Sequence, residues 1–213
     1  MRRLRKKRFQ TRPAYAFVVD GDTEIWYLQM LKRNEPKINV RIDPQMPNKK
    51  KLEEQFNFVA ELANKEYSKI FWIVDFDAII KESKEVAPGK KTSIRQFMDF
   101  RSRLLTKFTN VVVIVNNPCL EYWLLLHFEN TSKHFDNCSK SEERLKRYLK
   151  DYEKTWKYFT KQDNDIYLKL KPYIKTAIQN ATRLGQFDEY NPLKSICEMA
   201  QLFSSFELKN CIE

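Results

Sequence analysis

Two groups of acidic residues directly follow apolar runs in this sequence. In chain order they are Asp20, Asp22, Glu24, Asp75 and Asp77. Carboxylates are costly beside a hydrophobic core. When several converge, their repulsion raises their pKa values unless a cation lies between them. Oxygen ligands favour hard ions over zinc, so the sequence predicts a site for Mg²⁺ or Mn²⁺.

The spacing of these acids supports a shared site. In an open α/β sheet the functional crevice lies at the carboxyl ends of the strands, where both groups fall. Asp75 and Asp77 are two residues apart, so in an extended chain they point to the same side, while Phe76 points to the other. The alternative is structural, because aspartates are also common in turns and helix caps.

The acids are expected at the edge of a parallel sheet. Apolar or alternating runs predict strands at residues 14–19, 38–42, 70–74 and 111–115. Amphipathic segments predict helices at residues 23–33, 52–67, 94–108 and 118–129. This alternation is typical of a parallel sheet covered on both faces. We therefore expect an α/β core of four parallel strands over residues 13–130, followed by a helical extension without strands over residues 131–213. Helical patterns in this extension cover residues 141–154, 165–185 and 191–203, the last with an Asn-Pro start at Asn191.

The excess positive charge is concentrated at the N-terminal end of the sequence. Seven of the 39 Lys and Arg residues fall within residues 1–12, which contain no acid, and this leaves 32 bases against 28 acids for the rest. Such a basic arm is typical of a flexible segment that binds nucleic acid, and a solubilising terminus is the alternative. No apolar stretch is long enough to span a bilayer or to form a signal peptide, so we expect a cytoplasmic protein that does not contact a membrane.

The four cysteines are scattered, without a Cys-x-x-Cys pair. In a cytoplasmic protein they are expected to be reduced thiols. Cys119, His127, His134 and Cys138 lack the spacing of a zinc knuckle, so we do not expect them to bind zinc. The sequence also lacks a P-loop, a dinucleotide-binding glycine motif and a nucleophile elbow, which argues against the enzyme classes that depend on them.

Four segments together resemble the RloB family: VVDGDTE near the start, VDFD at the second acid group, NNPCLEYWLLLHFE after the fourth predicted strand, and a predicted helix that begins NPLKSICEM. Those proteins are similar in turn to the Toprim domain, a metal-binding α/β module of topoisomerases, primases and OLD-type nucleases. The resemblance implies that Asp20 matches the Toprim acid, that Asp75 and Asp77 hold Mg²⁺, and that Glu24 and Glu121 match further family acids.

The sequence departs from the family pattern at two points. Asp20 stands where Toprim domains have a glutamate, one methylene longer. The turn is compressed to DGDTE, so the roles of Asp22 and Glu24 stay ambiguous. Family members resemble components of phage-defence or restriction-linked loci, often encoded beside an ATPase.

Two residues of the third motif have structural alternatives. Glu121 lies near the start of the predicted helix, where the helix dipole favours a carboxylate, so it is either a capping residue or the family acid. His127 lies among Leu124, Leu126 and Phe128, so we expect a buried structural histidine instead of a general base.

We thus expect a Mg²⁺- or Mn²⁺-dependent nuclease of an antiviral defence or abortive-infection system, with DNA or RNA as substrate. Asp20, Glu24 and Glu121 are the catalytic candidates, and Asp20, Glu24, Asp75 and Asp77 are the metal ligands. The lysines expected to bind phosphates are Lys49, Lys50, Lys51, Lys90 and Lys91. The rival hypothesis is a non-catalytic nucleic-acid-binding or regulatory subunit of a partner ATPase, and a primase-like activity is a third. Homo-oligomerisation is left open.

Overall fold

The computed structural model describes residues 13–209, apart from Asp20, Asn39 and residues 48–50. The basic arm at residues 1–12 lies outside the described residues. None of the helices within the described part of the chain combines the length and apolar character that a membrane crossing requires.

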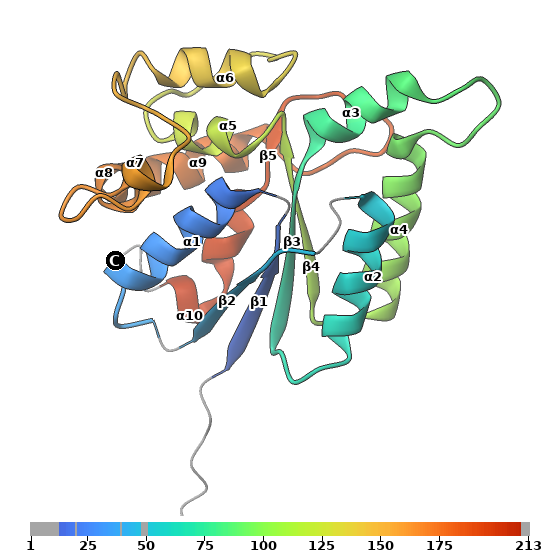
Figure 1. The fold of residues 1–213 in the computed structure, drawn as a ribbon, viewed down its shortest axis with the longest axis horizontal. Helices are drawn as coiled ribbons and strands as arrows, with labels where there is room; N and C mark the ends of the chain where they lie inside the picture. The colour runs from blue at the N-terminus through green and yellow to red at the C-terminus, as the bar shows by residue number, and fades with distance from the viewer. Residues whose placement is uncertain (1–12, 20, 39, 48–50, 210–213) are drawn as a thin grey trace, which may run out of the picture.

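Five strands form a single, mostly parallel sheet in the order β2-β1-β3-β4-β5 (Figure 1). Their bounds are β1 (Ala14–Val18), β2 (Arg41–Gln45), β3 (Lys69–Asp75), β4 (Val111–Asn117) and β5 (Ile196–Cys197). The first four are parallel, which confirms the predicted α/β class, although β2 begins three residues later than expected.

The fifth strand was missed by the sequence analysis. β5 pairs antiparallel with β4, with Ile196 opposite Asn117 and Cys197 opposite Asn116. The expectation that residues 131–213 contain no strand is therefore wrong. A strand of two residues is too short to show an alternating pattern, and only its pairing with β4 identifies it.

Helices cover both faces of the sheet (Figure 1). Those of the first half are α1 (Asp22–Asn34), α2 (Leu52–Ala63), α3 (Phe76–Glu85), α4 (Ser93–Lys107) and α5 (Leu120–Leu126). Because side chains alternate along a strand, Tyr15 and Phe17 of β1 pack with α1 and α5, whereas Ala16 and Val18 pack with α2 and α4. The sheet therefore separates two hydrophobic cores.

The C-terminal part is helical in short pieces. They are α6 (Cys138–Leu145), α7 (Trp156–Phe159), α8 (Ile166–Leu170), η1 (Lys171–Tyr173), α9 (Ile174–Leu184), η2 (Met199–Ser204) and α10 (Phe206–Lys209). The predicted helix starting at Asn191 is wrong, because turns, β5 and η2 occupy that segment. α9 packs beside α5, where the Asn180 side-chain amide donates a hydrogen bond to the Leu126 carbonyl at 2.9 Å.

A buried carboxylate joins the C-terminal part to the sheet. Glu198 is 3% exposed and accepts hydrogen bonds from the backbone N–H groups of Val115 at 2.9 Å and Phe187 at 3.1 Å. Burial raises the pKa of this carboxyl, and the two N–H donors act in the opposite direction. Glu198 therefore satisfies two backbone groups beside β4 that would otherwise be left without acceptors.

Candidate functional site

The two strands that lead into the acids are neighbours. β1 pairs in parallel with β3, so their carboxyl ends lie at the same edge of the sheet. Glu24 lies in the first turn of α1 and is 3% exposed, Asp75 ends β3, and Asp77 lies in the first turn of α3. The structure thus brings these three acids to one edge. Asp20, the fourth predicted ligand, lies outside the described residues.

Gly21 leaves room for the carboxylate of Glu24. A Cβ atom at position 21 would overlap Glu24 Oε2, which accepts a hydrogen bond from Thr23 Oγ1 at 3.1 Å. The φ of Gly21 is −128°, an extended value that any residue adopts. This glycine is therefore required for the close approach of Glu24, not for the handedness of the turn.

Asp75 accepts a hydrogen bond from the start of α5. Its Oδ1 is 3.1 Å from the backbone nitrogen of Leu120, the first residue of that helix. Cys119, the N-cap residue of α5, makes no side-chain capping bond. The carboxylate of Asp75 thus satisfies a helix N-terminal N–H group that local side chains do not.

Asp77 accepts a hydrogen bond from a different helix. Its Oδ2 is 2.9 Å from the backbone nitrogen of Cys138, the first residue of α6. The chain is helical from Phe76 onward, so the extended segment expected over Asp75–Asp77 ends at Asp75. The two carboxylates nevertheless bind the N-termini of α5 and α6, which a disulfide links, and their sharing of one ion stays a prediction.

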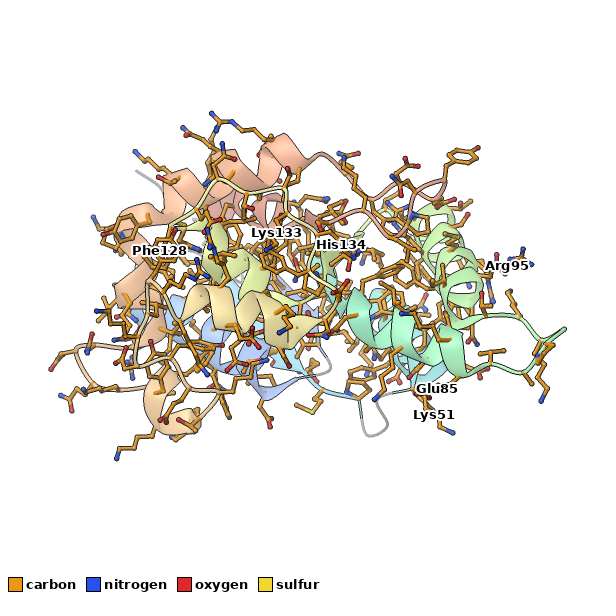
Figure 2. The ribbon with its side chains drawn as sticks, turned by 90° about the horizontal axis from the view of Figure 1, so that it is seen from above. Lys51, Glu85, Arg95, Phe128, Lys133 and His134 are labelled. Carbon is orange, nitrogen blue, oxygen red and sulfur yellow. A yellow bond between two sulfur atoms is a disulfide. The ribbon has the colours of Figure 1, made fainter. Side chains whose placement is uncertain are left out.

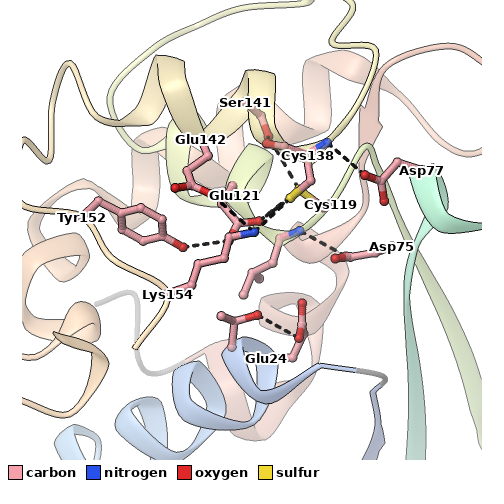
Figure 3. A network of polar contacts seen from close by, with 12 residues as sticks. Glu24, Asp75, Asp77, Cys119, Glu121, Cys138, Ser141, Glu142, Tyr152 and Lys154 are labelled. Carbon is pink, nitrogen blue, oxygen red and sulfur yellow. Dashed lines mark hydrogen bonds and ion pairs between the residues drawn. A yellow bond between two sulfur atoms is a disulfide. The ribbon is translucent and has the colours of Figure 1, made fainter. Parts of the chain in front are cut away.

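Glu121 is the centre of a buried polar network (Figure 3). It is 1% exposed, and its Oε1 lies 2.7 Å from the Tyr152 hydroxyl and 2.9 Å from Lys154 Nζ. Burial, and next the charge of Glu121, raises the pKa of Tyr152 well above its ordinary value, so the hydroxyl keeps its proton and donates. Within the described part of the chain, the polar contacts of the Glu121 carboxylate are with side chains, and the first N–H group of α5 binds Asp75 instead.

Lys154 links the separate acids electrostatically. Its Nζ is also 3.7 Å from a carboxylate oxygen of Glu142. Burial acts to lower the pKa of Lys154, but the carboxylates of Glu121, Glu142 and Asp75 outweigh this effect and raise it. The side chain is 38% exposed, and Figure 3 shows its ammonium group beside Glu121 and Glu142.

Cys119 and Cys138 form a disulfide, so the prediction that all cysteines are reduced is wrong. The bond joins the N-cap residue of α5 to the first residue of α6. The two sulfurs lie 3.0 and 2.8 Å from Glu121 Oε2. Among the described residues, Cys119, Glu121 and Cys138 are the one set of three metal-ligand types whose atoms lie within 4.8 Å of one another.

Neither histidine joins the cysteines. His127 is 1% exposed, and its Nδ1 lies 3.0 Å from the Trp123 carbonyl, which confirms the predicted buried structural role. Burial lowers the pKa of His127 from 6.5 to about 4. His134 is largely exposed and lies near Asp136 and Ser195 instead.

The predicted phosphate-binding lysines are only partly described. Lys49 and Lys50 lie outside the described residues. Lys51 is exposed at the start of α2 (Figure 2). Lys90 and Lys91 are exposed in the connection between α3 and α4, where Lys91 pairs with Asp99. Their binding to nucleic acid stays a prediction.

Sequence reasoning missed Tyr152 and Lys154. Both lie in the irregular segment between α6 and α7, which the sequence analysis assigned to a continuous helix. No sequence pattern links these two residues to Glu121, which lies 31 positions before Tyr152. The sequence does contain a signal for the other half of this network: Cys-x-Glu at positions 119–121 places a thiol close to a carboxylate.

The fold and these contacts define an α/β protein with acidic residues gathered at the carboxyl edge of a mostly parallel sheet. The chain belongs to the RloB-like protein family, whose model matches residues 15–205. No curated protein matches the chain, and no solved structure matches it.

Proposed function

We propose that this protein is a nuclease dependent on Mg²⁺ or Mn²⁺, with a Toprim-like core, acting on DNA or RNA in antiviral defence. The main support is that the acids following two neighbouring strands, β1 and β3, lie at one edge of the sheet. Membership of the RloB-like family and the resemblance of its motifs to the Toprim domain support the same reading.

The ligand type at this edge, carboxylate oxygen, suits a hard divalent cation, but Glu24, Asp75 and Asp77 do not form a set whose ligand atoms all lie within 4.8 Å of one another, so an ion would have to draw them together. Glu24, Asp75 and Asp77 offer only carboxylate oxygens, which Mg²⁺ and Mn²⁺ prefer to softer ligands. Glu24 is almost fully buried, at 3% exposure. These residues, together with Asp20, would hold the ion. When bound, the ion would activate a water molecule and offset the charge of the phosphodiester.

The chain itself fixes the orientation of these groups. Asp75 is held by the first N–H of α5 and Asp77 by the first N–H of α6. Glu24 is positioned against Gly21 by Thr23. Because each carboxylate is held by a contact of its own, each ligand would be oriented before an ion binds.

Lys154 and Glu121 complete the site. The ammonium group of Lys154 lies against Glu121 and within electrostatic reach of Asp75. In this position it reduces the repulsion among the acids and would attract a phosphate group approaching the edge. Glu121, neutralised by Lys154 and Tyr152, would position the lysine instead of binding metal.

The proposal is tested by cleavage assays on supercoiled plasmid, single-stranded DNA, single-stranded RNA and tRNA with Mg²⁺ or Mn²⁺. The wild-type protein should cut at least one substrate, and Asp75→Asn should abolish cutting while leaving the fold intact. Asp163→Asn is a matched control, because Asp163 is exposed and belongs to the loop before α8. Equal activity of Asp75→Asn and wild type would overturn the assignment.

A second candidate is a non-catalytic nucleic-acid-binding subunit that works with a partner ATPase. It is favoured by the observation that Glu121, Asp75 and Asp77 all have protein donors, as purely structural acids would. Deleting residues 1–12 separates the two candidates. Loss of nucleic-acid binding with persistent metal-dependent cleavage of short substrates supports the enzyme. Salt-sensitive binding without any cleavage supports the subunit.

A further inference from the structure

The disulfide joins the two backbone segments that hold the aspartates. Cys119 directly precedes Leu120, whose N–H binds Asp75, and the N–H of Cys138 itself binds Asp77. The covalent bond therefore links the N-termini of α5 and α6 at the point where both donate to the acidic edge (Figure 3).

We propose that Cys119 and Cys138 are a redox-active pair, reduced and reoxidised by small thiols and disulfides, and that the disulfide holds the N-terminus of α6 in place against Asp77. This inference deepens the proposed function, because Asp77 is one of the proposed metal ligands. The claim that the disulfide is redox-active and holds the N-terminus of α6 does not depend on nuclease activity.

Apart from the disulfide, the N-terminus of α6 is held by Asp77, which accepts from the Cys138 N–H, and by the Asn137 side chain, which caps the helix only locally by accepting from the Lys140 N–H. Residues 129–135, which lead to α6, form neither helix nor strand. The far end of α6 is anchored independently, because Leu145 is buried and Arg144 makes a bidentate ion pair with Glu129 at 2.7 and 3.0 Å. Reduction should therefore loosen the first turn of α6 while the rest of the helix stays attached.

The surroundings of the sulfurs suit a pair that changes state. Glu121 Oε2 lies within 3.0 Å of both sulfurs, and Ser141 Oγ is 3.6 Å from Cys119 Sγ. A carboxylate receives no hydrogen bond from a disulfide, whereas two thiols at these positions would donate to it. The site thus already contains the acceptor that the reduced form needs.

Of the two cysteines, Cys138 is the more accessible. Cys138 is partly exposed and its Sγ lies 3.3 Å from Lys154 Nζ, while Cys119 is fully buried. Reactive cysteines are typically partly exposed and close to a cation, which stabilises negative charge on sulfur. Cys138 is therefore the sulfur that exchanges with small thiols, and Cys119 is the resolving cysteine.

Reduction would proceed by two successive thiol–disulfide exchanges. A thiolate of the glutathione type attacks Cys138 Sγ, the bond to Cys119 breaks, and Cys119 leaves as a thiolate that takes up a proton. A second small thiol attacks the mixed disulfide, which releases Cys138 and an oxidised disulfide of the small thiol. Two thiols are oxidised for each protein disulfide that is reduced.

A thiolate metal site is the competing interpretation of the same residues. Cys119, Glu121 and Cys138 offer two sulfurs and an oxygen. However, Lys154 Nζ lies 2.9 Å from Glu121 Oε1 and 3.3 Å from Cys138 Sγ, so the ammonium group of this lysine already occupies the polar site. A bound metal ion would have to displace it, and the geometry therefore favours the redox pair.

The test is hydrogen exchange of the full chain in buffers of oxidised and reduced glutathione, with the disulfide followed by differential alkylation and peptide mapping. In the oxidised buffer, residues 119 and 138 should be the linked pair. On reduction, amides at residues 138–141 should exchange at least about tenfold faster, while those of β3 stay unchanged. Cys119→Ser should show the fast exchange in both buffers. Cys211→Ser, which removes a cysteine outside both the pair and the described residues, should behave like the wild type.

The outcomes decide between the interpretations. Failure of residues 119 and 138 to pair in any buffer, equal exchange in both buffers, or binding of one equivalent of Zn²⁺ by the reduced pair would overturn the inference. If Cys119→Ser fails to fold, Cys138→Ser replaces it, because it keeps the backbone N–H that binds Asp77.

Titration with Mn²⁺ in the same buffers adds the functional link, with an expected rise in dissociation constant of about fivefold or more on reduction. Binding that is equally tight in both buffers would overturn the link to the metal ligands. If Mn²⁺ binds in neither buffer, the proposed function fails, and the inference about α6 is decided by hydrogen exchange alone.

Discussion

Asp77 accepts a hydrogen bond from the backbone N–H of Cys138 at 2.9 Å, although the two residues are 61 positions apart. The contact ties the first turn of α3 to the first turn of α6, so a proposed metal ligand also anchors a helix. Mutation can remove the negative charge of Asp77 while keeping an oxygen that accepts this hydrogen bond.

Asp77→Asn keeps an acceptor for the Cys138 N–H but removes the negative charge. We expect the variant to fold with a free energy of unfolding close to that of the wild type, but to lose metal-dependent activity. Asp77→Ala should lose activity and also about 1 kcal/mol of stability, because it leaves a backbone N–H without its acceptor. Urea unfolding together with cleavage assays measures both effects. Full activity of Asp77→Asn would show that the charge is not needed.

Gly21→Ala should act on the site through Glu24. The added Cβ would overlap Glu24 Oε2, so the carboxylate must move away from the turn. We expect a folded protein whose affinity for Mn²⁺ falls by roughly tenfold, about the loss expected for one misplaced ligand. Calorimetric titration gives the affinity.

The matched comparison for Gly21→Ala is a double variant. Because the alanine acts by displacing Glu24, adding Gly21→Ala to Glu24→Gln should weaken binding no further. An additive loss in the double variant would mean that Gly21 acts on the site by some other route.

Lys154→Met should destabilise the fold, because it leaves the buried carboxylate of Glu121 without its cation. Breaking a fully buried ion pair costs about 3–5 kcal/mol, and we expect about 2 kcal/mol here since Lys154 is partly exposed. Chemical denaturation provides the value. Glu121→Gln in the same chain should recover part of the loss, because it removes the unpaired charge.

Lys65→Met is the control for this effect. Lys65 pairs with Glu61 at 2.6 Å, but both side chains are more than half exposed. Removal of such a surface pair should change stability by less than about 0.5 kcal/mol. A Lys154→Met variant as stable as Lys65→Met would contradict a structural role for the pair with Glu121.

His127 should make stability depend on pH. Burial lowers its pKa from 6.5 to about 4, and its Nε2 atom is buried without a hydrogen-bond partner in the described structure. The folded state therefore binds the proton less readily than the unfolded state. The contribution of neutral His127 to the free energy of unfolding is complete above pH 6.5, declines as pH falls, and is lost by about pH 4. The shift corresponds to about 3 kcal/mol.

His127→Phe should remove this part of the pH dependence. The measurement is the difference in unfolding free energy between wild type and variant at pH 7 and pH 4.5. His134→Gln serves as the matched control for the loss of a histidine, because His134 is largely exposed. Parallel profiles for wild type and His127→Phe would contradict the assignment.

The main sheet could be predicted because its signals are local. Buried parallel strands appear as continuous apolar runs, such as Ile70–Val74, and the alternation with amphipathic helices identifies the α/β class. β5 could not be predicted, because two residues carry no periodicity. The predicted helix at Asn191-Pro192 failed because a favourable helix start does not ensure that a helix follows it.

The acids could be predicted, but not their contacts. Position at the end of an apolar run identified Glu24, Asp75 and Asp77. The bond from Cys138 to Asp77 and the ion pair between Lys154 and Glu121 depend on how the irregular segments around α6 fold back over α5. Such long-range contacts leave no trace in spacing or composition.

The central claim is that Glu24, Asp75 and Asp77 gather to hold a divalent cation. Titration of Mn²⁺ into the oxidised protein, followed by electron paramagnetic resonance, tests it without assuming a substrate. We predict binding by wild type and Asp163→Asn, and binding at least about tenfold weaker for Asp75→Asn. Equal binding by all three proteins, or no binding by the wild type, would contradict the claim.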